Sequence, residues 1–328
     1  MDLPQISVVV PAYNIAQWLP RSLDSLLAQT YPNLEIVVVD DGSGDDTRAV
    51  AQDYAARFDN VRLICKENGG TTSARLRGVA EATGTWIGFM DGDDEIDPDM
   101  YRRLMDNARN CEADISHCGH RVRFPDGRIS YVHNSGVVRR QDHLTGQRDL
   151  LDGGLIESSL CTKLFRRELF DGLEEYMDRD ISINEDYLMN FYLFSRARQS
   201  IFEDFCPYCY HLRQGSASYR VLHEHSIFDP IRVRRKILET CEPEIREDAR
   251  RALLRNLLFA YAQLSENPRR EYDSFRTRVR EQLQGEREWF SLLSPRNRVL
   301  AWMICRAPWS FRLAYRTYVA VFRREEQH

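Results

Sequence analysis

The sequence LEIVVVDDGSGDDT, residues 34–47, changes within a few positions from an apolar run to acids and turn-forming residues. A short run rich in Val and Ile, bounded by turn residues, is typical of a strand buried on both faces of a parallel sheet. The DDGS that follows the run consists of residues that are common in turns and at helix N-termini. This stretch therefore predicts a buried strand that ends in polar residues before a helix begins.

The same pattern recurs along the first third of the chain. Three other segments are short and apolar: ISVVV (6–10), VRLIC (61–65) and TWIGFM (85–90). Helical patterns lie between the strands, in residues 18–27, 45–58 and 71–84. Regular alternation of strands and helices predicts an α/β protein with a doubly wound, mostly parallel sheet and helices on both faces.

The pattern changes twice further along the chain. After residue 110 it loosens, and the turn FPDG at 124–127 has flanks that predict a hairpin. Beyond about residue 220, charged amphipathic helices continue to residue 294. We therefore expect a domain over residues 1–220, made of the halves 1–110 and 111–220, and a helical C-terminal region over residues 221–328.

The composition limits the kinds of partner and compartment. The chain has 328 residues, a formal net charge of −5 and 43% hydrophobic residues, which gives no sign of a nucleic-acid partner. No stretch approaches the ~20 apolar residues that span a bilayer. Residues 1–5 do not resemble the start of a secretory leader, so we expect a cytoplasmic protein.

The cysteines indicate free thiols. Eight of them are dispersed along the chain, as is usual for a protein in a reducing compartment. Cys206 and Cys209 form a CxxC pair, but no second pair exists to complete a zinc site. Cys118 lies between His117 and His120, and we expect this cluster to be structural as well. We therefore expect no structural zinc.

The chemistry is expected where the parallel strands end. Ligands of open α/β sheets bind outside the carboxyl ends of the strands. Those ends are polar or aromatic here, in residues 11–14, 40–43, 67–70 and 91–94. Acids arriving from two strands require a cation, and hard oxygen ligands favour Mg²⁺ or Mn²⁺. A cation held by only one or two carboxylates completes its shell with substrate phosphates.

The segment FMDGDDEID (89–97) places Asp91, Asp93 and Asp94 within four positions. One alternative is a solvated turn. Another is a calcium loop, but the glutamate expected at its twelfth position is replaced by Arg102. Neither GxGxxG after the first strand nor a P-loop motif is present. The pattern favours a metal–diphosphate site in which a cation, rather than a glycine loop, neutralises the phosphates.

The order of several motifs resembles the family 2 glycosyltransferases with the GT-A fold. In the first half these motifs are SVVVPAYN, SLDSLLAQTYPNLEIVVVDDGSGDDT, NGGTTSARLRG and GTWIGFMDGDDEIDPDMY. In the second half they are CTKLFRRELF, NEDYLMNFYLF and YCYHLRQGSAS. The resemblance covers roughly residues 5 to 220, with a C-terminal helical extension beyond it. It implies a bacterial enzyme of polysaccharide or glycan assembly that uses a nucleotide-sugar donor, with a UDP-sugar favoured.

The resemblance also assigns donor-site residues. The implied nucleotide-sugar-binding residues are Pro11, Ala12, Tyr13, Asp41, Asn68, Arg75, Asp91, Gly92 and Arg213. The implied ligands of Mn²⁺ or Mg²⁺ are Asp93, Asp91 and Asp94. A carboxylate at Asp41 suits an imide N–H of uracil, because a charged acceptor makes a strong hydrogen bond. Arg75 would lie near the diphosphate; its alternative is a solvated helix arginine.

The acceptor half supplies the implied catalytic acids, Asp186 and Glu185. Inverting transfer needs a carboxylate that deprotonates the acceptor hydroxyl, and Asp186 is the preferred base. Ser182 and Glu185 have the spacing of a capping box, which would use Glu185 structurally. Tyr208, Tyr210, Arg213 and Ser216 match a loop that closes near the donor in relatives, although tyrosines at a period of two also suit a strand face.

The C-terminal tail, residues 296–324, holds seven arginines and no acid. Its aromatic face (Phe311, Tyr315, Tyr318, Val319 and Phe322) predicts a basic amphipathic helix that lies on an anionic membrane. The alternative is a helix packed on the protein. A lipid-linked or glycan acceptor would suit membrane docking.

Two other functions remain open from the sequence. The chain could be a sugar-nucleotide pyrophosphorylase, or a catalytically silent nucleotide-binding scaffold. The residues do not identify the sugar, the acceptor or the linkage. They also leave the oligomeric state open, because exposed tail aromatics suit a dimer as well as a membrane.

Overall fold

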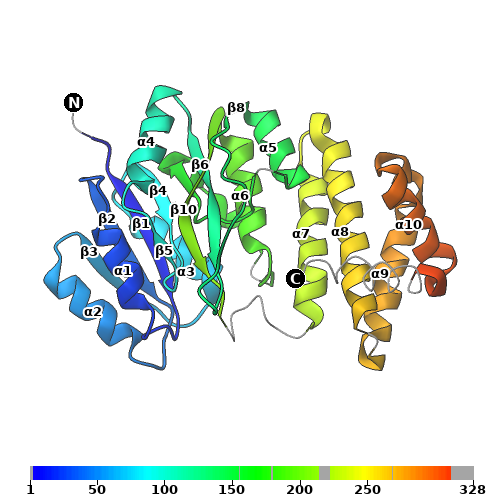
Figure 1. Cartoon of the computed structure of the whole chain (residues 1–328), viewed down its shortest axis with the longest axis horizontal. Helices are drawn as coiled ribbons and strands as arrows, with labels where there is room; N and C mark the ends of the chain where they lie inside the picture. The colour runs from blue at the N-terminus through cyan, green and yellow to red at the C-terminus, as the bar shows by residue number, and fades with distance from the viewer. Residues whose placement is uncertain (1–2, 155, 179, 214–221, 268, 312–328) are drawn as a thin grey trace. The chain divides into compact units, whose positions relative to one another are not determined.

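The computed structural model describes residues 3–154, 156–178, 180–213, 222–267 and 269–311. The chain divides into two compact units, residues 1–220 and 221–328. Figure 1 labels the α-helices of both units and most of the strands. Each unit has its own hydrophobic core and is described separately.

The first half of the N-terminal unit alternates strands and helices, as the sequence predicts. Its elements are β1 (Ile6–Ala12), α1 (Leu19–Leu27), β2 (Leu34–Asp40), α2 (Thr47–Arg57), β3 (Val61–Cys65), α3 (Gly70–Glu81), β4 (Trp86–Phe89), β5 (Glu95–Ile96) and α4 (Met100–Asn110). Every residue of β2 is buried, so this strand has packing neighbours on both faces. The strong valine content of these strands therefore reflects burial on both sides.

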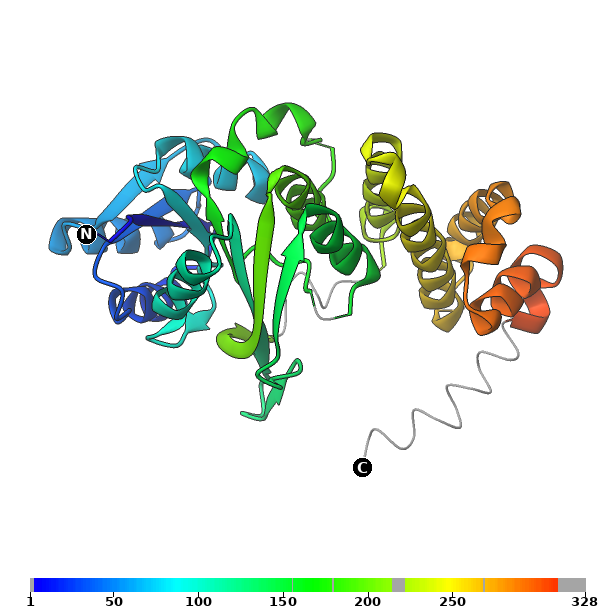
Figure 2. The same ribbon diagram turned by 90° about the horizontal axis from the view of Figure 1, so that it is seen from above.

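The second half of this unit is less regular. Its elements are β6 (Ile115–Arg123), β7 (Ile129–Tyr131), β8 (Val138–Asp142), α5 (His143–Asp152), β9 (Lys163–Arg166), α6 (Glu185–Arg196) and β10 (Gln199–His211), with 3-10 turns η1 (Arg167–Phe170) and η2 (Leu173–Tyr176). The predicted hairpin is confirmed: β6 and β7 pair on either side of the turn at 124–127. Figure 2 shows this hairpin extending away from the sheet.

One sheet unites the two halves, in the order β3-β2-β1-β4-β9-β6-β10-β5, with β7 on β6 and β8 on β10. β1 runs parallel to β2 and β4, β2 to β3, and β6 to β10. β9 is antiparallel to both β4 and β6, which gives β6 the direction of β4. Six of the ten strands therefore point one way. Helices cover both faces (Figures 1 and 2), which confirms the predicted doubly wound, mostly parallel sheet.

The register brings the predicted polar segments to one edge of the sheet. Ala12 pairs with Asp40, and Val9 pairs with Phe89, so β1, β2 and β4 end close together. The chain after β4 forms a short turn, in which the Asp94 amide donates to the Asp91 carbonyl at 3.1 Å. β5 then pairs antiparallel with the end of β10. This pairing ties the acidic turn to a strand from the other half of the unit.

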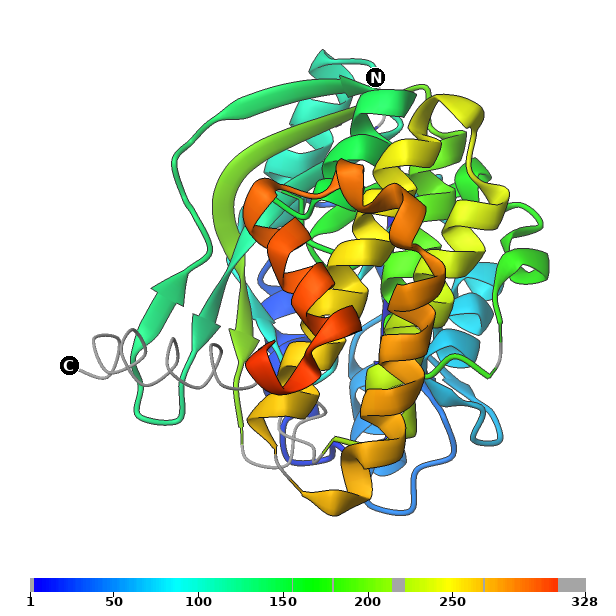
Figure 3. The same ribbon diagram turned by 90° about the vertical axis from the view of Figure 1, so that its right-hand side faces the viewer.

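The C-terminal unit is helical, as predicted. Its elements are α7 (Glu224–Thr240), η4 (Pro243–Ile245), α8 (Arg246–Glu266), η5 (Arg270–Tyr272), α9 (Asp273–Gly285), η6 (Arg287–Leu292) and α10 (Pro295–Arg306). Figure 3 looks onto these helices. The expected stripe of Leu253, Leu254, Leu257, Leu258 and Tyr261 lies in the core of this unit.

The structure corrects the expectation for the start of the tail. Residues 295–306 form α10, whose Ala301 and Ile304 are buried in the same core. Phe311, expected on a membrane-facing stripe, is only 2% exposed and packs edge-on against Tyr261. The other residues of the predicted face lie outside the described residues. Among the helices described, none is long and apolar enough to cross a membrane.

Candidate functional site

A cleft of about 700 Å³ lies at the carboxyl edge of the parallel strands. It is lined by Pro11, Ala12, Tyr13, Asp41, Arg75, Asp91, Gly92, Asp93, Asp94, Glu185, Asp186 and Arg213 among the residues singled out from the sequence. Asn68 is exposed and does not line the cleft. Ser216 lies outside the described residues. The fold therefore gathers residues from positions 11 to 213 into one place.

Arg75 connects the two halves of the cleft. This α3 side chain is 7% exposed, and its Nη2 lies 3.0 Å from Asp91 Oδ1 while its Nη1 lies 3.4 Å from Glu185 Oε1. Burial opposes the charged guanidinium, but the surrounding carboxylates outweigh burial and raise the pKa of Arg75. The alternative of a solvated helix arginine is wrong, because Arg75 is buried between acids from both halves of the sequence.

The acidic turn holds its three carboxylates in three different environments. Asp91 is paired with Arg75, and Asp93 forms an ion pair with Arg213. Gly92 lies between them, and a Cβ there would lie 2.5 Å from Ile15 Cδ1, so a side chain at this position would displace the end of Ile15. Each ionised aspartate thus has a cationic partner, which reduces the repulsion between neighbouring like charges.

Asp94 is held differently, as a buried hydrogen-bond acceptor. It is 1% exposed, and it accepts from Tyr208 Oη at 2.6 Å and from the His211 amide at 2.9 Å. Burial, together with the charge of Asp91, raises the pKa of Asp94 to about 7 despite these two donors. Asp94 therefore fixes the turn to β10 rather than facing a ligand.

Asp41 closes the other end of the cleft. Its Oδ1 accepts from Lys66 Nζ at 2.5 Å and from the Gly69 amide at 3.0 Å, while its Oδ2 accepts from the Gly70 amide at 2.8 Å. Asp41 thus holds the first residues of α3 in place from the end of β2. A carboxylate has about four acceptor positions, so these three bonds leave one on Oδ2.

The two catalytic candidates start α6 beside Arg75. Burial, reinforced by Asp186, raises the pKa of Glu185 to about 7. Burial also raises the pKa of Asp186, although the nearby Arg75 opposes this shift. The capping-box prediction is wrong: α6 is preceded by Asn184 at φ 66°, with no side-chain cap hydrogen bond. The left-handed Asn184 turns the chain sharply and directs Glu185 toward Arg75.

Sequence reasoning missed residues that shape the cleft. Trp18 lies under the Arg213 guanidinium, 3.6 Å from its carbon to the ring centroid. Lys163 is fully buried and donates to the carbonyls of Glu157 and Ser159, whose residues line the cleft. The motif CTKLFRRELF contains this lysine, but no spacing rule links it to a loop four to six residues before it.

A hard divalent cation fits part of the aspartate set. Asp91 and Asp93 are partly exposed in the cleft and offer hard oxygen ligands. Asp94 has both its oxygens occupied by donors from β10. Within the described residues, the three aspartates do not bring three ligand oxygens within 4.8 Å of one another. The turn therefore suits a cation held by one or two carboxylates, with the rest of the shell from phosphates.

Solved structures share this fold. The chain superposes on the crystal structure of S. aureus TarS 1–349 with a TM-score of 0.73 and 19% identity, covering 98% of this chain and 92% of that one. At this level of identity the similarity establishes the fold alone, which is the GT-A fold with added C-terminal helices. The fold predicted from the sequence motifs is confirmed.

The chain belongs to glycosyl transferase family 2, because the sequence model of that family matches residues 7–173. It is 36% identical over 200 residues to the uncharacterized glycosyltransferase EpsJ of Bacillus subtilis (strain 168), covering 60% of this chain and 58% of EpsJ. It is 32% identical over 225 residues to the succinoglycan biosynthesis protein ExoO of Rhizobium meliloti (strain 1021), covering 67% of this chain and 64% of ExoO. Each match thus spans less than two thirds of the relative's length.

Removing the charge of Arg75 should destabilise the N-terminal unit in a pH-dependent manner. Arg75→Gln leaves Asp91 and Glu185 without a partner, which should cost about 2–3 kcal/mol at pH 8, or roughly 5–10 °C in melting temperature. The loss should be smaller at pH 6. The pKa of Glu185 is already raised to about 7, and without Arg75 it rises further, so protonation at lower pH relieves the unpaired charge.

Thermal unfolding of both forms at pH 6 and pH 8 measures this effect. Arg77→Gln is the matched control, because Arg77 is an exposed arginine of the same helix that pairs with Glu81 one turn later. Its removal should change stability by less than about 0.5 kcal/mol. An equal loss for Arg75→Gln at both pH values would contradict the role of uncompensated carboxylates.

Proposed function

We propose that this chain is an inverting glycosyltransferase that transfers a sugar from a UDP-sugar to a hydroxyl group of a glycan or lipid-linked acceptor. The observation that carries the proposal is the cleft, where Arg75 and Arg213 lie among the carboxylates at the carboxyl edge of the sheet. Family membership supports transfer of a sugar, and it gives no support to a pyrophosphorylase. Crystal structures of TarS with UDP and with UDP-GlcNAc support a uridine nucleotide as donor.

The base would bind between Tyr13 and Asp41. Tyr13 is 51% exposed at the cleft, so its ring is available for stacking. The unused acceptor position of Asp41 Oδ2 can receive an imide N–H of uracil. The backbone donors from Gly69 and Gly70 hold this carboxylate in a fixed orientation.

The diphosphate would replace carboxylates as the partner of the two arginines. Arg75 and Arg213 are now paired with Asp91 and Asp93, and a donor phosphate offers each guanidinium a bidentate anion. Release of Arg213 frees Asp93 for Mn²⁺ or Mg²⁺, with Asp91 as the second candidate ligand. When bound, such a cation would neutralise the charge of the leaving diphosphate.

Asp186 would act as the general base. As the acceptor oxygen bonds to the anomeric carbon, its proton passes to Asp186. The bond from the anomeric carbon to the phosphate oxygen breaks, and its electron pair leaves with the nucleoside diphosphate. One displacement of this kind inverts the anomeric configuration. Glu185 is held by Arg75, which leaves Asp186 freer to receive the proton.

Nucleotide binding should be selective and should depend on the cation. In a thermal-shift panel of UDP, GDP, CDP and dTDP, each with and without Mn²⁺, we expect UDP with Mn²⁺ to raise the melting temperature most, because a ligand that binds only the folded state stabilises it. Asp93→Asn should lose the cation-dependent part. No shift with any nucleotide would count against both the donor site and the enzyme, and would favour a scaffold.

Removal of the base should affect turnover without affecting donor binding. Asp186→Asn should reduce transfer by about 10²–10⁴-fold and leave the UDP-induced thermal shift unchanged. The wild-type rate should fall as pH decreases, because a base with a raised pKa gains its proton at a higher pH than an ordinary aspartate does. Glu185→Gln is the control, since it retains an acceptor for Arg75. Near wild-type transfer by Asp186→Asn would reassign the base.

We also propose that the protein works at the cytoplasmic face of a membrane, on which its basic tail docks. The four arginines of residues 312–324, which contain no acid, support attraction to anionic lipids. The full chain should sediment with vesicles that contain anionic lipid, and a chain ending at residue 311 should sediment less. That end point keeps Phe311 and α10 in the core. Equal sedimentation of both chains would contradict a docking role for the tail.

A further inference from the structure

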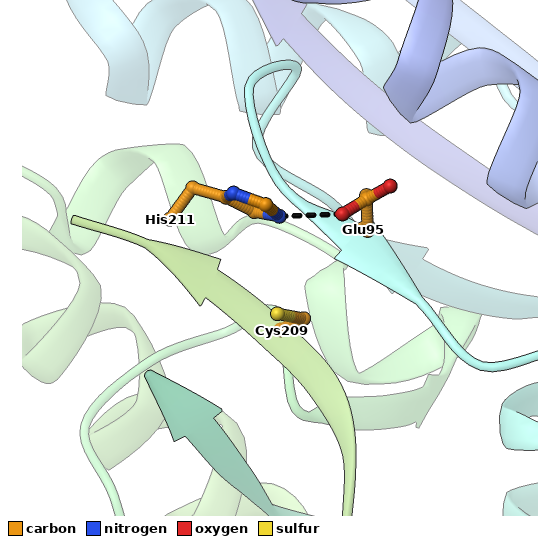
Figure 4. Close-up of side chains that lie close together, drawn as sticks. All are labelled: Glu95, Cys209 and His211. Carbon is orange, nitrogen blue, oxygen red and sulfur yellow. Dashed lines mark hydrogen bonds and ion pairs between the residues drawn. The ribbon is translucent and has the colours of Figure 1, made fainter. Parts of the chain in front are cut away.

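A second cluster of metal-ligating side chains lies outside the cleft. Glu95, Cys209 and His211 each offer one ligand atom, and these atoms lie within 4.8 Å of one another. It is the one group of three such residues among those the structure describes. Figure 4 shows the three side chains, from β5 and β10, with His211 Nε2 bonded to Glu95 at 2.6 Å.

The pairing of β5 with β10 creates this cluster. Cys209 is the direct cross-strand partner of Glu95, so their side chains lie on the same face of the ladder. His211 follows two residues later on β10 and therefore lies on that face as well. Tyr208 and Tyr210 alternate to the other face, where they line the cleft. The cluster is thus on the side of β10 away from the proposed donor site.

The chemistry of the three residues distinguishes them from the aspartates. A thiolate, an imidazole and a carboxylate match the ligands that Zn²⁺ takes in proteins, whereas Mg²⁺ and Mn²⁺ prefer oxygen ligands alone. Ionised Cys209 and Glu95 with a neutral His211 would balance the two positive charges of zinc. Zinc bonds of about 2.0–2.3 Å require only small shifts from the present separations.

The surroundings permit a cation at this position. Arg21 lies 3.8 Å from Glu95 Oε1, but it also donates to the Asp93 carbonyl. Arg121, the neighbour of Cys209 on β6, is neutralised by two bonds to Asp97. Glu95 and His211, though not Cys209, line a hollow of about 510 Å³ that has room for a water as the fourth ligand. Arg21, Arg123 and Arg213 also line this hollow, so zinc would bind beside positive charges.

We propose that Glu95, Cys209 and His211 form a zinc site that stabilises the pairing of β5 with β10. That pairing has only two residue pairs, Tyr208 with Ile96 and Cys209 with Glu95. Zinc would cross-link the strand that directly follows the acidic turn to the strand that holds Asp94. The expectation of no structural zinc considered cysteine spacing and residues close together in the sequence, which cannot show that two distant strands pair.

Zinc binding by the full-length chain tests the proposal. After removal of metal with a chelator under reducing conditions, equilibrium dialysis against Zn²⁺ and elemental analysis give the stoichiometry. The wild type should bind one equivalent that Cys209→Ser and His211→Ala lose, with affinity reduced more than about 100-fold, since loss of an outer-shell partner alone costs 10–100-fold. The bound equivalent should also raise the melting temperature.

Matched variants distinguish zinc at this cluster from zinc held by another thiol or by the cleft. Cys206→Ser removes a buried cysteine of the same strand, whose Sγ contacts the Val132 carbonyl, and it should retain the bound zinc. Asp93→Asn should retain it too, because Asp93 belongs to the cleft. With Co²⁺ in place of zinc, the wild type should show a thiolate charge-transfer band that Cys209→Ser lacks.

Three results would overturn the proposal. They are failure of the wild type to bind zinc, retention of the equivalent by Cys209→Ser, and its equal loss in Cys206→Ser. Circular dichroism establishes that each variant is folded before its stoichiometry is compared. None of these readouts depends on nucleotide binding or sugar transfer, so failure here leaves the proposed function untouched.

Discussion

The buried guanidinium of Arg75 is the constraint on which the rest of the site depends. It comes from α3, yet its partners are Asp91 after β4 and Glu185 at the start of α6. An unpaired charge in this position would be strongly destabilising, and so would either carboxylate without it. The two halves of the N-terminal unit are therefore joined by ion pairs, among them those of Arg75 and the pair of Asp93 with Arg213, as well as by one sheet.

The charges of the other acids in the cleft are also compensated or reduced. Asp93 is paired with Arg213, and the pKa of Asp94 is raised to about 7, so that Asp94 carries only part of a negative charge at neutral pH. The cleft thus contains many acids with little net repulsion. Protein cations now occupy positions where a cation and a diphosphate would compete for the same groups. Exchange of one set of ion pairs for another would let the site bind a highly charged donor without a large change in net charge.

The sequence predicted the first half of the fold better than the second. Valine-rich runs identify β1 to β4 because local burial on both faces determines their composition, and their polar ends locate the cleft. By contrast, β9 lies between β4 and β6, and β5 pairs with β10, through contacts that no local period reveals. The ion pair of Asp93 with Arg213 joins residues 120 positions apart. The sequence spacing predicted a capping box before α6, where the structure has a left-handed Asn184 instead. The helical periodicity placed Phe311 on an exposed face, whereas tertiary packing buries it against Tyr261.

The strand order has a consequence for synthesis of the protein. β4 pairs with β1 on one side and with β9 on the other, and β9 begins at Lys163. A ribosome that has completed the first four strands therefore releases a sheet with an open edge, and such edges pair readily with other chains. The donors to Asp94 come still later, up to 117 residues downstream. The nascent chain thus carries an unprotected strand and an unsupported acidic turn until most of the N-terminal unit has been made.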